Sequence, residues 1–248
     1  MSRKKLQQNI WKLYLIKALN SFLLTIPVIV LFFQENGLTM SQVLLLQSLF
    51  SVSAILMEVP TGYFSDIFGR KRSIIIGGFV STLGFTIYSQ SYGFWGFLAA
   101  EIILGIGFSF TSGADDAMLC DTLLESGEGY KYMKMKGKSN SFGMISSGLA
   151  SVLGGFLAVV SLRYPLYWDV GVTFLIVPVA LTLFEPKRHL EEKRESSLSS
   201  MVRLVKFSLH DHSEIKWLII YSSIASSSTL VMFWFIQPYL LATQVPLH

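Results

Sequence analysis

Residues 62–72 read GYFSDIFGRKR, which places two glycines and an aspartate beside three consecutive cations. This charged stretch follows an apolar run that ends in LMEVPT. The whole chain has 248 residues, of which 52% are hydrophobic and only 15% are charged, and its mean hydropathy is +0.52. A soluble domain cannot hide so much apolar surface from water. We therefore expect the chain to lie in a bilayer, with residues 62–72 at its surface.

The apolar stretches predict membrane-spanning helices. An apolar window of about 20 residues crosses the hydrocarbon core as a helix, because the backbone finds no water there and must pair within the segment. The chain has seven such stretches, namely residues 10–33, 41–62, 73–90, 93–114, 140–161, 165–184 and 215–240. The first is too long for the apolar region of a signal peptide and precedes no small-residue cleavage site, so we interpret it as a retained span. The predicted fold class is all-α, a polytopic membrane protein.

The cations predict the orientation of these spans, because lysine and arginine near span ends favour the cytoplasmic side. Of the 20 lysines and arginines, 18 precede the first span or follow the second, fourth and sixth spans. The exceptions are Lys17, within the first span, and Arg163, in an outer connector. The N-terminus is thus predicted to be cytoplasmic, in a bacterial inner membrane or plasma membrane. The net charge of +4 suits contact with anionic membrane lipids and gives no reason to expect nucleic acid.

In this topology residues 62–72 form a short cytoplasmic turn between the second and third spans. Gly62 and Gly69 allow close backbone approach and positive φ in a tight connector. Asp66 can accept hydrogen bonds from free N–H groups where a helix begins, and Arg70 offers a two-pronged contact to a carboxylate. We expect this cluster to hold helices together at the membrane surface.

The pattern GxxxDxxGRKR between these two spans resembles the signature loop of the major facilitator superfamily of secondary transporters. It includes Lys71 and Arg72, which also have a simpler interpretation as positive-inside anchors. The family usually has arginine or lysine directly after the aspartate, where this chain has Ile67. The resemblance implies a gate whose charged groups pair with neighbouring helices in one conformation and separate in the other. The candidate partners lie at the inner end of the fourth span and are Asp115, Asp116 and Asp121.

The resemblance covers about residues 8–240 and implies an organisation in three parts. These are a six-helix transporter half (1–184), a cytoplasmic central linker (185–214) and the first helix of an incomplete second half (215–248). Apolar residues of the linker share one helical face, which predicts a short amphipathic helix on the inner leaflet. They are Leu198, Met201, Val202, Val205 and Leu209.

Glu101 is the strongest candidate for a functional charge within a span, where ionisable residues are costly in free energy and indicate function by default. It lies about two turns from the outer end of the fourth span. Related transporters have an arginine in this helix, followed by two glycines whose spacing is retained here by Gly105 and Gly107. A carboxylate at this place can carry a proton or contact a substrate. The alternatives are a structural pairing and exposure at the outer surface.

Other polar residues within the spans have several interpretations. Lys17 and Glu58 lie near the inner thirds of adjacent spans, where they can pair, reach the membrane surface, or contact a substrate or proton. Asn20 and Gln47 are further possible contacts of a substrate. Asp169, near the outer end of the sixth span, is expected to be an interfacial charge.

Small residues recur every four positions on two spans and predict close helix packing, which drives helix association in lipid. On the fourth span the stripe begins at Glu101 and continues through Gly105, Ser109 and Gly113. On the fifth span it consists of Gly143, Ser147, Ser151 and Gly155.

No motif indicates an enzyme, a cofactor or a metal site. The four histidines lack the spacing of metal ligands on a helix, and neither a phosphate-binding loop nor a matched nucleophile and base is present in the sequence. We expect alternating-access transport of a small-molecule substrate by a truncated secondary transporter, with proton-coupled efflux as the favoured form. A complementary C-terminal half or a homo-oligomer would complete the substrate path. The alternative is an inactive fragment or a non-transporting membrane protein that assembles with a partner.

Overall fold

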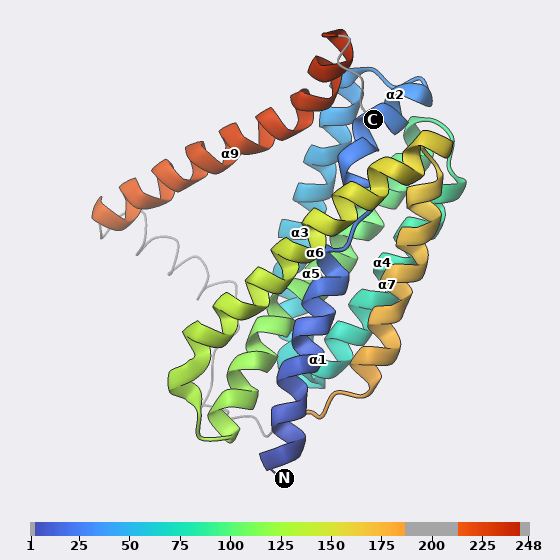
Figure 1. Cartoon of the computed structure of the whole chain (residues 1–248). Coiled ribbons are helices and arrows are strands. Elements are labelled where there is room, and N and C mark those ends of the chain that lie inside the picture. Colours follow the sequence, from blue (N-terminus) through green and yellow to red (C-terminus); the bar gives the residue numbers. More distant parts are fainter. Residues whose placement is uncertain (1–2, 187–212, 244–248) are drawn as a thin grey trace. The chain divides into compact units, whose positions relative to one another are not determined.

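The computed structural model describes residues 3–186 and 213–243, and every regular element within these ranges is helical (Figure 1). The chain divides into two compact units, Met1–His189 and Leu190–His248. The first unit contains α1 (Arg3–Ser21), η1 (Ile26–Val28), α2 (Ile29–Glu35), α3 (Met40–Phe68), α4 (Arg70–Gln90), α5 (Phe94–Glu125), η2 (Gly129–Lys131), α6 (Tyr132–Val160) and α7 (Tyr164–Leu181). The second contains α9 (Ser213–Ala242). The predicted amphipathic helix of the linker lies outside the described residues.

Seven helical segments in the described residues are long and apolar enough to cross a membrane, which confirms the predicted all-α polytopic fold. The helices extend further than predicted at one end of the first unit. This end carries the N-terminus, the α3–α4 junction, the α5–α6 connector and the end of α7, and we call it the cation-rich end (Figure 1). There α3 continues to Phe68, α5 continues to Glu125, and α6 begins at Tyr132. Hydropathy marks only the length inside lipid, whereas backbone hydrogen bonds continue the helix into water.

The first span is broken, although a continuous helix over residues 10–33 was predicted. Helix α1 ends at Ser21, and the chain resumes as η1, with Pro27 in its first turn, followed by α2. A proline disfavours the helical conformation of the preceding residue and lacks an N–H group for the backbone ladder. The sequence therefore contained a signal for this break.

The spans of the first unit pack in a pattern that repeats after three helices. Helix α3 packs on α5, as α6 packs on α1. Helix α4 packs on α5, as α7 packs on α1, and α4 also packs on α7. Only 11% of the spanning window of α3 and 17% of that of α6 is buried, compared with 39% for the other four spans. Helices α3 and α6 therefore flank a centre formed by α1, α4, α5 and α7.

Glycines on two faces of α5 allow its neighbours to approach closely. A Cβ atom on Gly105 would lie 2.7 Å from the carbonyl oxygen of Phe50 in α3. A Cβ atom on Gly107 would lie 2.8 Å from the backbone nitrogen of Ser81 in α4. The predicted packing role is thus confirmed for Gly105, whereas the space around Gly113 is open.

The predicted stripe on the fifth span is only partly correct. The buried face of α6 consists of Ser139, Gly143, Ser146, Ala150 and Gly154, whereas Ser147 is exposed and a Cβ on Gly155 would contact nothing. Ser146 donates a hydrogen bond to the carbonyl of Ala18 at 2.7 Å. A strict four-residue repeat drifts around a helix that has 3.6 residues per turn, so the contact face follows mixed steps of three and four.

Candidate functional site

The α3–α4 junction is much tighter than the turn over residues 62–72 that was predicted from the sequence. Helix α3 ends at Phe68 and α4 begins at Arg70, so Gly69 alone separates them. Gly69 has φ of +115°, a conformation that strongly favours glycine, and its predicted positive φ is confirmed. Gly62 lies inside α3 with open space around it. Its predicted close approach and positive φ are wrong, because α3 continues past it.

Glu185 caps the start of α4, a role that the sequence interpretation gave to Asp66. Its Oε1 accepts the N–H of Arg70 at 2.8 Å, and its Oε2 accepts the N–H of Lys71 at 2.9 Å. A carboxylate at a helix N-terminus satisfies free N–H groups and opposes the positive end of the helix dipole. Asp66 instead lies in the last turn of α3. Sequence reasoning missed Glu185, because it lies 115 residues from Arg70.

The end of α7, from which Glu185 extends, is itself fixed by α1. The amide of Asn9 donates to the carbonyl of Phe184 at 2.7 Å and accepts the N–H of Phe184 at 3.0 Å. Lys12 donates to the carbonyl of Thr182 at 2.7 Å. Through these contacts the cation-rich ends of α1, α7 and α4 form one connected polar structure.

Arg70 joins three helices at the same end. Its guanidinium pairs with Asp66 of α3, and its Nε lies 3.6 Å from Oδ2 of Asp121 in α5. The Arg70 side chain is only 16% exposed, whereas that of Asp66 is 42% exposed. Of the remaining motif cations, Lys71 is half-buried and Arg72 is exposed. The Arg70 contacts fit the expectation that the motif holds neighbouring helices together.

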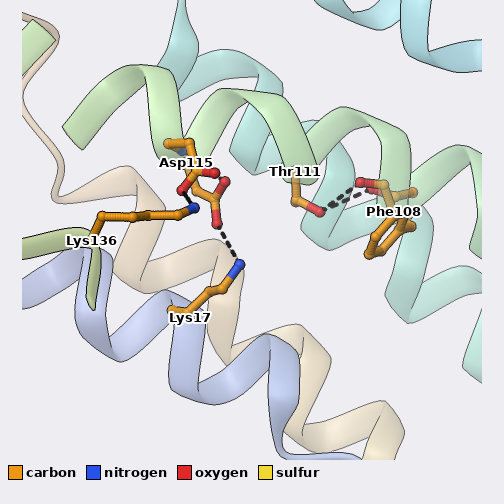
Figure 2. Close-up of polar contacts among 7 residues, drawn as sticks. Lys17, Phe108, Thr111, Asp115 and Lys136 are labelled. Atoms are coloured by element: carbon orange, nitrogen blue, oxygen red, sulfur yellow. Dashed lines mark hydrogen bonds and ion pairs between the residues drawn. The ribbon is translucent and has the colours of Figure 1, made fainter. Parts of the chain in front are cut away.

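Asp115 and Asp116 were grouped with Asp121 as partners of the motif, but the structure places them in a separate charge cluster. Asp115 lies 3.3 Å from the ammonium of Lys17 in α1, and Asp116 pairs with Lys136 in α6 (Figure 2). Asp121 follows Asp115 by six positions, which places it about 9 Å further along the helix axis and on a different helix face. These two aspartates therefore connect α5 to α1 and α6.

The suggested pairing of Lys17 with Glu58 is not found, because Lys17 pairs with Asp115. Glu58 lies on the exposed face of α3. Asn20, in the last turn of α1, is half-buried.

Glu101 of α5 is buried where it meets side chains from α3 and α4. Its residue is only 4% exposed, so the alternative of outer exposure is wrong. Its Oε1 accepts a hydrogen bond from Gln47 of α3 at 2.8 Å and another from the hydroxyl of Tyr88 of α4 at 3.2 Å. Tyr88 also packs against Phe32 and Phe97. The structure therefore supports pairing at Glu101 and leaves a role in proton transfer to be tested.

Asp169 was expected to be an interfacial charge, but it is fully buried. It lies in the second turn of α7 and faces the break in the first span. Its Oδ1 accepts the N–H of Leu24 at 2.8 Å, and its Oδ2 accepts the N–H of Thr25 at 3.0 Å. The N–H groups freed by the broken helix explain why a carboxylate is buried here.

A groove opens at the surface of the first unit, and the part of the chain that the structure describes contains no metal cluster. The groove, of about 810 Å³, lies between α1 and α6 and is lined partly by Trp11, Tyr14, Phe142 and Lys138. The rings of Trp11, Tyr14 and Phe142 pack on one another. The lining of this groove combines aromatic, aliphatic and polar side chains, and it contains none of the charged pairs described above.

Comparison with known proteins gives a consistent result. The sequence profile of the Major Facilitator Superfamily matches residues 11–247. Multidrug resistance protein 2 of Bacillus subtilis (strain 168) is 23% identical over 208 residues, which cover 80% of this chain and 50% of that protein. Quinolone resistance protein NorA of Staphylococcus aureus (strain MRSA252) is 26% identical over 169 residues, which cover 66% of this chain and 42% of that protein. The chain thus spans about half, or less, of the length of these curated relatives.

Proposed function

Because the chain belongs to the Major Facilitator Superfamily, we propose that it takes part in the export of a small molecule across a membrane by alternating access. The seven candidate spans and the family match support transport. The direction of export is inferred from relatives whose names refer to multidrug and quinolone resistance. Since the chain spans only part of these relatives, the second wall of the substrate path is assigned to a complementary half or to a second copy.

The cation-rich end acts as a latch in this proposal. Arg70 connects α3, α4 and α5 through Asp66 and Asp121, and these charges are partly exposed. Asp66 keeps the most contact with water, and an ion pair with an exposed partner contributes only about 0–1 kcal/mol, so its loss costs little free energy. Helices α3 and α5 can therefore separate from Arg70 in one state and return in the other.

Glu101 is the proposed proton carrier, and its burial at the meeting point of α3, α4 and α5 is the observation that carries the coupling proposal. Both hydrogen-bond donors reach Oε1, so Oε2 is the oxygen that receives the proton. Protonation weakens the hydrogen bonds from Gln47 and Tyr88, because a neutral acid is a weaker acceptor than a carboxylate. The proton thereby changes the contacts between three helices.

Transport in inverted membrane vesicles tests this function. The chain is expressed alone and together with the second half of a relative, and movement of ethidium is followed after a proton gradient is imposed. Gradient-dependent movement in either arm, absent from vesicles without the chain, is the expected result. Well-folded chain that moves no ethidium in either arm would contradict the proposal and favour a non-transporting membrane protein.

A further inference from the structure

The break in the first span has a carboxylate built against it. Between Ser21, where α1 ends, and Ile26, where η1 begins, the backbone leaves the helical ladder. Asp169 of α7 accepts the N–H groups of Leu24 and Thr25 and also the hydroxyl of Thr25. Both carboxylate oxygens are engaged, and the site is fully buried. The broken conformation is therefore stabilised by a side chain from another span.

The opposite side of the break rests on α6. A Cβ atom on Gly154 would overlap the carbonyl oxygen of Leu24 and would lie 2.9 Å from its carbonyl carbon. Ser146 donates to the carbonyl of Ala18 at 2.7 Å, in the last turn of α1. The break thus lies between Asp169, which binds its N–H groups, and a glycine that leaves room for its carbonyl.

The outer piece of the first span, residues 26–35, is also contacted at its other end by a residue that adjoins α7. Arg163, directly before α7, donates to the side-chain oxygen of Asn36 at 2.7 Å and to the carbonyls of Ser89 and Ser91, each at 2.9 Å. Its guanidinium also lies over the ring of Phe32, 5.2 Å from the centroid. The outer piece, residues 26–35, is therefore held at both ends by residues from the start of α7.

Among the described residues, only uncharged groups contact the carboxylate of Asp169, so the strength of these hydrogen bonds depends on its own charge. The donors that reach it from the first span are Leu24 and Thr25, which carry no charge. The α6 residue beside the break is Gly154, and Thr173 of α7 donates to the backbone carbonyl of Asp169. Within the described residues no cation is paired with Asp169, since Arg163 is directed at Asn36, Ser89 and Ser91. The N–H and O–H donors alone stabilise the carboxylate.

We propose that Asp169 is a positioning residue whose charge state determines whether the first span stays broken at residues 22–25. When it is ionised, both oxygens accept hydrogen bonds and hold the break. A proton that binds Oδ2 forms an O–H bond and turns the Thr25 hydroxyl from donor into acceptor. The same proton weakens the bond from the Thr25 N–H, because hydrogen bonds to a charged acceptor are about twice as strong as neutral ones. The outer piece is then free to move against α1.

Asp169 would thus be a second proton-responsive group besides Glu101. It lies near the end of the first unit that is opposite the cation-rich end. Asp169 lies in the second turn of α7, whereas the latch around Arg70 lies at the other end of the same spans. Its use in coupling rests on the proposed transport function, but the hinge itself does not. A measurement of the backbone at the break therefore separates the two.

Amide hydrogen exchange of the full chain in lipid nanodiscs tests the inference. Peptides that cover residues 22–28 are followed from neutral to mildly acidic pH, after correction for the intrinsic pH dependence of exchange. In the wild type we expect exchange to become about tenfold faster at acidic pH, the change given by loss of one hydrogen bond of about 1.4 kcal/mol. Asp169→Asn is expected to exchange fast at both pH values. Thr25→Val, which retains both N–H bonds, should keep the pH dependence.

Glu35→Gln is the matched control, because Glu35 is an exposed carboxylate on the same outer piece. It should behave as the wild type. Exchange in the wild type that does not change with pH would overturn the inference, as would an Asp169→Asn variant with wild-type protection. If Asp169→Asn does not fold, the wild-type and Thr25→Val profiles still decide. A chain that transports no ethidium but shows the expected exchange refutes the transport function alone.

Discussion

Replacing Gly105 by alanine tests whether the contact between α3 and α5 positions Glu101. A Cβ at this position would overlap Oγ of Ser53 and lie 2.7 Å from the carbonyl oxygen of Phe50. Ordinary contacts begin at 3.4 Å, so α3 must move by about 0.7 Å, the difference between 3.4 and 2.7 Å. The atom that must move belongs to backbone, so a side-chain rotation does not relieve the clash.

The magnitude follows from comparison with a glycine in open space on the same helix. Overpacking costs about 1–3 kcal/mol, and alanine in a helix is about 1 kcal/mol more favourable than glycine. Gly113→Ala gains only the second effect, because its Cβ would contact nothing within 4 Å. The difference between the two variants isolates the clash. We expect Gly105→Ala to be about 2–3 kcal/mol less stable than Gly113→Ala, the upper part of the overpacking range.

The assay is unfolding of the purified chain in mixed detergent micelles with increasing dodecyl sulfate, followed by helical circular dichroism. The same shift of α3 should weaken the bond from Gln47 to Glu101, which is 2.8 Å long and lies about one turn from Gly105. Two variants whose unfolding free energies agree within about 0.5 kcal/mol would refute the reasoning, because that is the range of substitutions without specific effect.

Three further predictions use the same unfolding assay. Gly154→Ala should lose about 1–3 kcal/mol relative to Gly155→Ala, because only the first Cβ meets the Leu24 backbone; equal stabilities would refute the packing at the break. Gly69→Ala should lose about 1–3 kcal/mol relative to Gly62→Ala, because only Gly69 has positive φ; an unchanged Gly69→Ala would argue for a different junction. Glu185→Gln should lose about 0.5–2 kcal/mol through the weakened cap of α4, and no loss would show that the cap is unimportant.

The spans were predictable because membrane insertion is a local property of a sequence. Each window of about 20 apolar residues satisfies its own backbone, whatever its neighbours are. The positive φ of Gly69 was also predicted correctly, because glycine favours such a connector, although the same argument failed for Gly62. The short length of the α3–α4 junction was not predicted, because hydropathy does not show that α3 continues through Gly62 to Phe68.

The partners of the charged residues were not predictable from their positions in the chain. Asp115 and Asp121 lie in one helix, yet they contact different neighbours, since depth and rotation within the bundle select the partner. Glu185 was missed as a cap because its contact with Arg70 depends on how α7 ends against α1. Such contacts follow from helix packing, which single-sequence patterns do not specify.

The break in the first span combines a feature that the local sequence indicates with a contact that depends on helix packing. Pro27 indicated an interruption within residues 10–33, and a closer interpretation of that proline would have found it. The carboxylate of Asp169 lies 144 residues from Thr25, and nothing in either local sequence connects them. Its burial became understandable only when the free N–H groups of Leu24 and Thr25 were located.

The most direct test of the coupling claim is ethidium-driven proton movement in inverted vesicles that contain the chain and a second half of a relative. Wild-type chain and the Glu35→Gln control are predicted to move protons when ethidium is added, because Glu35 is exposed, whereas Glu101 is buried. Glu101→Gln, which cannot bind a proton, is predicted to lose this movement while keeping its fold. Ethidium-driven proton movement that persists in Glu101→Gln at the wild-type rate would contradict the account.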